Sequence, residues 1–222
     1  MPAIADHNRL IAHAAKVSLA PLGCMQKGRS RLWFDDHGWW VAVVEFQPSA
    51  WGKGSYLNAA AMWLWNAKDH WSFDEGGRVD TFHEFKNESQ FTDAAARLAA
   101  RAAAEVLSLR RMFGSVEAAA THLAQKDKKG IWDHYHAAMS SAVTGMSSYA
   151  RSQFAEVASA RVHAPWVAEL QAKAASFSSR ASSLELLQQA VRDEVVAARS
   201  LLKLSPLEEN RNLWASRVEA EP

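Results

Sequence analysis

The sequence predicts an α+β protein with an N-terminal helix, a mostly antiparallel sheet of about four strands, and an all-helical C-terminal half. Three changes of pattern support this. Apolar residues recur at helical spacing near the start, at the two-residue spacing of strands between residues 31 and 85, and again at helical spacing beyond residue 92. We therefore divide the chain into a tryptophan-rich α+β region, residues 1–113, and a helical bundle region, residues 114–222.

The first predicted elements are a helix and a hairpin. Between residues 6 and 20, apolar side chains recur every three or four positions, and Pro21 and Gly23 end the stripe. The segments RLWF and WWVAVVEF then flank the polar residues 35–38, which predicts two strands joined by a short loop. The second of these strands is apolar on both faces, so we expect it to be central.

Residues 56–65 and 79–85 predict two further strands. The first follows the turn-rich segment 48–54 and is apolar throughout, although its alanines are also compatible with a helix. The second alternates in the manner of a half-exposed strand. The pair Gly76-Gly77 predicts a turn between them.

Beyond Thr92, which we expect to be an N-cap, the pattern is helical. Arg101 and Glu105 are spaced to pair along the first of these helices, and Gly114-Ser115 ends it and begins the next. The buried face of this first helix is predicted to consist of apolar residues three or four positions apart: Leu98, Ala102, Val106, Leu109 and Phe113.

The remaining helices have recognisable boundaries. Residues 126–130 form a charged loop, a second apolar stripe follows over residues 132–146, and Pro165 is placed as in the first turn of a helix. Capping boxes that begin at Ser182 and Ser205 predict helices near 183–204 and 206–219. The stripe through Val191 suits a bundle helix and leaves open a homodimer through this half.

Composition and charge limit the classes of function. With 25 basic and 24 acidic side chains the net charge is +1, which argues against a nucleic-acid partner. The single cysteine, Cys24, fits a reducing compartment. Charged residues interrupt the first twenty positions, which excludes a signal peptide, and no apolar run approaches the roughly 20 residues that span a bilayer. We expect a cytoplasmic protein with no membrane partner.

The ten tryptophans are the most unusual feature of the composition. We interpret most of those in the front third as core residues. Because neighbouring strand residues point to opposite faces, Trp39 and Trp40 can both be buried only if the sheet is covered on both sides. Trp51 follows the central strand on a loop, and it is the best candidate for an exposed binding residue.

Polar side chains gather near the end of the same strand. Glu45 and Gln47 share a face, and Asn58 in the next strand is placed to lie beside them. Buried polar groups must be hydrogen-bonded, so we favour a structural role for these three over a catalytic one. The cations Arg29 and Lys53 flank the same region and complete a predicted recognition surface with Trp51.

No complete catalytic or cofactor motif is present. Asp36 followed by Glu45-Phe46-Gln47 partly matches the acidic pair and E-x-K signature of metal-dependent nucleases, but the lysine is absent. His134 and His136 diverge on a helix and cannot chelate a metal together. We therefore expect no cofactor and no metal, and leave open whether the protein is an enzyme.

One stretch resembles a known family. The run from Leu22-Gly23 through Lys27-Gly28-Arg29, followed by GWWVAVVEFQPSAWGKGSYLNAA at 38–60, resembles the bacterial family called domain of unknown function 4304. The resemblance covers roughly residues 10–90, and it implies a leading helix and a strand that ends in Phe-Gln. It departs at Glu45, where the family often has asparagine, and it names no activity. The matching residues are Phe46, Gln47, Ser49, Trp51, Gly52, Tyr56, Leu57 and Asn58.

Together these observations predict a binding or protein-interaction module of a bacterial cytoplasm, with an unidentified protein or small molecule as its ligand. The alternative is a metal-dependent hydrolase or nuclease that uses Asp36 and Glu45. The binding surface would consist of Arg29, Glu45, Gln47, Trp51, Lys53 and Asn58.

Overall fold

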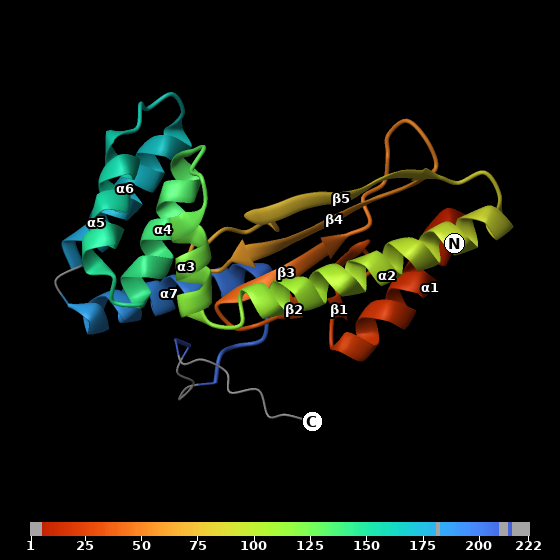
Figure 1. The fold of residues 1–222 in the computed structure, drawn as a ribbon, viewed down its shortest axis with the longest axis horizontal. Coiled ribbons are helices and arrows are strands. Elements are labelled where there is room, and N and C mark those ends of the chain that lie inside the picture. The colour runs from red at the N-terminus through yellow and green to blue at the C-terminus, as the bar shows by residue number, and fades with distance from the viewer. Residues whose placement is uncertain (1–5, 181–182, 209–212, 215–222) are drawn as a thin grey trace. The chain divides into compact units, whose positions relative to one another are not determined.

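The computed structural model describes residues 6–180, 183–208 and 213–214 of the chain (Figure 1). Two compact units are present, the chain up to Trp63 with His70–Arg111, and Leu64–Asp69 with the chain from Met112 onward. In order, the elements are α1 (Asp6–Leu19), the 3-10 turn η1 (Ala20–Leu22), β1 (Met25–Gln26), β2 (Leu32–Asp36), β3 (Trp40–Glu45), β4 (Gly54–Trp63), β5 (Glu75–Glu84), α2 (Glu88–Met112), α3 (Val116–Gln125), α4 (Ile131–Val143), α5 (Ser147–Ser159), α6 (Pro165–Arg180) and α7 (Leu184–Leu202).

The sheet of the first unit is antiparallel, with the strand order β1-β2-β3-β4-β5. The α+β fold class is therefore confirmed, with five strands in place of about four. The additional strand β1 has two residues, of which Met25 pairs with Phe34. So short a strand has no alternation by which a sequence could reveal it.

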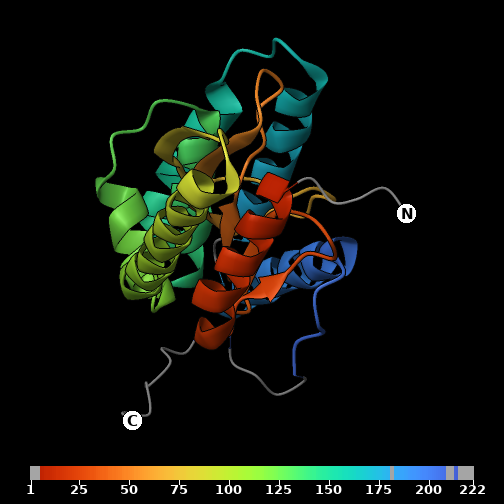
Figure 2. The same ribbon diagram turned by 90° about the vertical axis from the view of Figure 1, so that its right-hand side faces the viewer.

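One face of the sheet packs against α1 and α2, which run side by side along it (Figures 1 and 2). Trp33 and Val44 from the sheet, and Phe46 directly after β3, lie in one apolar cluster with the buried stripes of both helices, such as Ile11 and Leu98. Each of these side chains is at most 4% exposed. The core of the first unit therefore follows the predicted apolar spacings of the helices and of the central strand.

The helix α2 begins earlier than predicted. Asn87 Oδ1 accepts a hydrogen bond of 2.9 Å from the backbone N–H of Gln90, which is the geometry of an N-cap. Thr92 lies inside the helix, where its hydroxyl donates to the carbonyl of Glu88 at 2.8 Å. The predicted cap at Thr92 is therefore wrong, because a threonine in the first turns can donate to a helix carbonyl instead of capping the N-terminus.

The predicted turn at Gly76-Gly77 is also wrong, since both glycines belong to β5. Gly76 has φ +129°, and a Cβ atom there would lie 2.5 Å from the carbonyl oxygen of Ala59 on β4. Close approach of the two backbones therefore requires glycine at this strand position.

Two helices in the second unit begin at the predicted residues. Ser115 caps α3 through a 3.2 Å bond from the backbone N–H of Ala118, and Pro165 begins α6. The cap of α7 is Ser183, which accepts from the backbone N–H of Leu186 at 3.3 Å. Ser182, the predicted cap, lies outside the described residues.

The helix predicted from residue 206 does not begin there. Lys203 ends α7 in the left-handed conformation with φ +59°, and residues 204–208 are irregular. Residues 209–212 and 215–219 of that prediction lie outside the described part of the chain. No helix that the structure describes has the length and hydropathy needed to cross a bilayer.

The second unit incorporates the short segment Leu64–Asp69 from the middle of the chain. Trp65 is fully buried, and its Nε1 donates to His136 Nδ1 at 3.1 Å. The backbone N–H of Ala67 donates to Glu194 Oε2 at 3.1 Å. This segment therefore packs against α4 and α7 as part of the helical core.

Candidate binding surface

The register of the sheet places five polar or aromatic side chains together. Glu45 on β3 lies opposite Asn58 on β4, and Asn58 lies opposite Arg78 on β5. Gln47 and Tyr56 are adjacent, because the backbone N–H of Tyr56 donates to the carbonyl of Gln47 at 2.9 Å. These five residues are called the polar cluster below.

Hydrogen bonds join the polar cluster into one chain. Asn58 Nδ2 donates to Glu45 Oε2 at 3.1 Å and to Gln47 Oε1 at 2.9 Å. Arg78 donates from Nη2 to Gln47 Oε1 at 2.6 Å and from Nε to Asn58 Oδ1 at 3.4 Å, and its guanidinium lies 3.9 Å from the centre of the Tyr56 ring. The structure thus brings Glu45, Gln47 and Asn58 together as the sequence predicted.

Sequence reasoning did not assign Arg78 or Tyr56 to the binding surface, although Tyr56 is among the residues that carry the family resemblance. Only the pairing of β4 with β5 brings Arg78 to Asn58, twenty positions away, and that register contains irregularities around Leu57. Asn58 is 8% exposed, whereas Arg78 is an exposed residue. Its place directly before the predicted strand 79–85 was the one available signal, because a cation at a strand end needs a partner or solvent.

The loop that joins β3 to β4 has a fixed base and an exposed tip. Gly54 has φ +151°, and a Cβ atom there would lie 2.2 Å from the carbonyl oxygen of His83. The carbonyl of Lys53 accepts from the backbone N–H of Phe85 at 2.9 Å. Trp51 at the tip is 97% exposed, although its backbone N–H donates to Ser49 Oγ at 3.1 Å.

The β1–β2 loop lies at the same end of the sheet, because Leu32 at the start of β2 pairs with Glu45 at the end of β3. Arg29 on this loop is exposed, as is Lys53 on the neighbouring loop. Arg31, which sequence reasoning missed, donates from Nη1 to the carbonyls of Phe46 at 3.3 Å and Gly54 at 3.1 Å. Arg31 thereby ties the two loops together.

Asp36 and Glu45 are not brought together. Asp36 pairs with Val41 and Glu45 with Leu32, so the two carboxylates lie four strand positions apart, about 13 Å. Metal–oxygen bonds of about 2 to 2.6 Å do not span that separation. Within the described ranges, no three His, Cys, Asp or Glu side chains are grouped so that they could hold a metal ion.

A buried network of charged side chains near the turn between β2 and β3 connects the sheet to α2. Asp35 Oδ2 lies 2.6 Å from His37 Nε2 and 2.8 Å from Arg110 Nε, which joins β2 to α2. Burial opposes ionisation of Asp35, but these hydrogen bonds and the charges of both partners outweigh it and lower the pKa to about 2. Burial raises the pKa of the nearby Cys24 thiol to about 11, so this thiol is neutral at pH 7.

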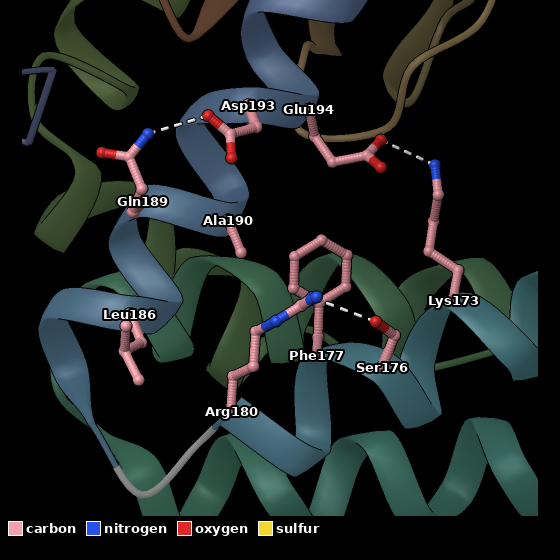
Figure 3. Close-up of a pocket in the computed structure, with 9 residues that line it drawn as sticks. All are labelled: Lys173, Ser176, Phe177, Arg180, Leu186, Gln189, Ala190, Asp193 and Glu194. Atoms are coloured by element: carbon pink, nitrogen blue, oxygen red, sulfur yellow. Dashed lines mark hydrogen bonds and ion pairs between the residues drawn. The ribbon is translucent and has the colours of Figure 1, made fainter.

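The second unit has a cavity of about 640 Å³ between α6 and α7 (Figure 3). Phe177 points from α6 toward Ala190 on α7. On the rim, Lys173 Nζ pairs with Glu194 Oε2 at 2.7 Å, which neutralises both charges. The other lining residues are Ser176, Arg180, Leu186, Gln189 and Asp193.

No protein-family model matches the chain, and neither the curated proteins nor the solved structures contain a significant match.

Proposed function

We propose that the protein is a binding or protein-interaction module whose recognition surface combines the polar cluster with the β3–β4 loop. The observation that carries this proposal is the 97% exposure of Trp51 on a loop whose base is fixed by Arg31, Lys53 and Gly54. Binding residues concentrate on loops that a rigid scaffold presents. Tryptophan is also one of the residues, with tyrosine and arginine, that are enriched among those that dominate binding energy at protein interfaces.

The exposed indole has no packing function in the chain to explain it. Trp33, Trp40 and Trp63 are at most 4% exposed and contribute to folding, whereas nearly the whole surface of Trp51 contacts solvent. The resemblance of residues 10–90 to domain of unknown function 4304 stays part of the proposal, as does the bacterial cytoplasmic setting. Since that family has no assigned activity, it supports the fold of the module and leaves its ligand open.

Affinity capture from a lysate of the source organism tests the proposal. We expect Trp51→Ala to lose at least about 80% of the specifically captured partner, as truncation of a binding hot spot costs 2 kcal/mol or more. Trp166→Ala is the matched control, because Trp166 is 40% exposed and lies in the second unit. Equal capture by the wild type and Trp51→Ala would show that the loop is not the recognition surface.

A further inference from the structure

We propose that Arg78 is the residue through which the polar cluster binds a carboxylate group of a polypeptide partner. This inference rests on the proposed function, because it names the chemistry that the same surface recognises. Arg78 is the outermost member of a row that crosses three strands, from Glu45 on β3 through Asn58 on β4 to β5.

Contacts within the chain hold Arg78 in one orientation. Its guanidinium lies over the ring of Tyr56 at 3.9 Å, a cation–π contact, and Nη2 donates to Gln47 Oε1 at 2.6 Å. An arginine fixed in this way loses less side-chain entropy on binding than a freely rotating one. The guanidinium is therefore pre-organised for a planar acceptor such as a carboxylate.

Arg78 also retains donors for a ligand. A guanidinium has five N–H groups in a planar fork, and the contacts with Gln47 and Asn58 use one on Nη2 and one on Nε. Both acceptors are neutral amide oxygens. No Asp or Glu in residues 6–180, 183–208 or 213–214 forms an ion pair with Arg78, so its charge is not neutralised there.

Glu45 favours a carboxylate over a phosphate as the bound oxyanion. Its Oε2 accepts from Asn58 Nδ2 at 3.1 Å, and no Lys or Arg of the described residues forms an ion pair with it. A phosphate carries a charge of about −1.5 to −2 and would be repelled more strongly by this carboxylate than a single carboxylate would. The N–H groups of a polypeptide can in turn donate to Glu45.

The polar cluster and Trp51 belong to one continuous surface. Tyr56 contacts Phe82 with ring centres 5.0 Å apart, and a Cβ atom on Gly52 would lie 3.7 Å from the same Phe82 ring. The loop residue next to Trp51 therefore lies against the Phe82 ring, which contacts Tyr56, and the Arg78 guanidinium lies over Tyr56. A peptide that covers the indole can reach the guanidinium.

Selection of random peptides on the full-length protein tests this inference. The library has two formats, one with a free C-terminal carboxylate and one with the random segment inside a carrier protein. Each selected peptide is then made with its carboxylates replaced singly by amides, and affinities are measured by fluorescence polarisation at fixed ionic strength. If only the format with a free C-terminus yields binders, Arg78 binds a C-terminal carboxylate. If the internal format also yields binders, the bound carboxylate belongs to an Asp or Glu side chain.

We expect one carboxylate in each selected peptide to matter, with its amide analogue binding at least about tenfold more weakly to the wild type. Arg78→Gln should bind the carboxylate and amide forms equally, and Arg78→Lys should recover only part of the preference. Arg111→Gln is the control, because Arg111 is exposed on α2 and should leave the preference intact. Inorganic phosphate should compete no better than acetate at equal concentration.

Equal affinity of carboxylate and amide peptides for the wild type would overturn the inference, as would a preference that persists in Arg78→Gln. Stronger competition by phosphate than by acetate would overturn the choice of a carboxylate. If Trp51→Ala leaves peptide affinity unchanged while Arg78→Gln abolishes the preference for the carboxylate form, the proposed role of Trp51 is overturned and the role of Arg78 is supported. A library that yields no binder in either format overturns both proposals.

Discussion

At the scale of single residues, exposure separates Trp51 from the core aromatic residues. Phe46 is fully buried, so we expect Phe46→Ala to lower the free energy of unfolding by roughly 3 to 5 kcal/mol. Trp51→Ala removes a side chain that is 97% exposed and should change stability by less than about 0.5 kcal/mol. Urea unfolding of both variants measures the difference. Comparable losses of stability would show that the indole packs against the protein.

The buried Asp35 carboxylate predicts a specific dependence of stability on pH. Its folded-state pKa is about 2, below the roughly 3.9 of an unfolded chain, so the stabilisation is complete above pH 4. It is lost as the pH falls from about 4 toward 2, and it amounts to about 2 to 3 kcal/mol.

The variant Asp35→Asn should therefore lose stability at pH 7 and show a shallower decline between pH 4 and 2. Asp93→Asn is the control, because Asp93 is exposed on α2. Urea unfolding midpoints measured at pH 7 and between pH 4 and pH 2 give the loss of stability and the steepness of its decline. If the stability of Asp35→Asn falls as steeply between pH 4 and pH 2 as that of the wild type, the role given to His37 and Arg110 is contradicted.

At the scale of elements, α7 offers a matched pair of valines. Val191 is fully buried, so Val191→Asp places an unpaired charge in the core of the second unit and should cost at least about 4 kcal/mol. Val196 is 49% exposed on the same helix, so Val196→Asp should cost no more than about 0.5 kcal/mol. Because both variants change the same residue types, helix propensity cancels in the comparison.

Far-UV circular dichroism during thermal unfolding checks this expectation. Equal melting temperatures for Val191→Asp and Val196→Asp would contradict the burial of the stripe. Sedimentation of the same material tests the homodimer that the sequence leaves open, since a Val191→Asp variant that stays folded but changes from dimer to monomer would place the stripe at a subunit interface.

At the scale of the whole molecule, the chain enters the second unit twice. Leu64–Asp69 belongs to that unit, although the predicted division at 113/114 assigns these residues to the first. Trp65 in this segment is fully buried and bonded to His136. Loss of a buried tryptophan costs about 3 to 5 kcal/mol, or roughly 10 to 30 °C in melting temperature for a region of this size.

A fragment of residues 114–222 should therefore melt well below the full-length chain or fail to fold cooperatively. Adding a synthetic peptide that spans residues 62–71 should raise its melting temperature, and the same peptide with Trp65→Ala should not. Scanning calorimetry of the fragment gives both measurements. A fragment that melts like the intact chain would show that the Leu64–Asp69 segment contributes nothing to the helical core.

Residue patterns by themselves determined the fold class and most elements of this protein. Local chemistry sufficed where the signal is local, as for the helical stripe through Val191, the cap at Ser115 and the first-turn Pro165. The same reasoning placed Glu45 and Gln47 on one face, because side chains in a strand alternate with a period of two. It failed at Thr92, whose residue type fits both a cap and a helix interior.

Only the tertiary structure decided which distant residues meet. The β4–β5 register brings Arg78 to Asn58, and it also makes Gly76 a strand residue through close contact of two backbones. Packing of Trp65 in the helical unit is equally invisible to periodicity, since its partners lie some seventy positions away. Register and packing depend on shape complementarity between distant segments, whereas spacing along a chain reports only which side of an element faces the core.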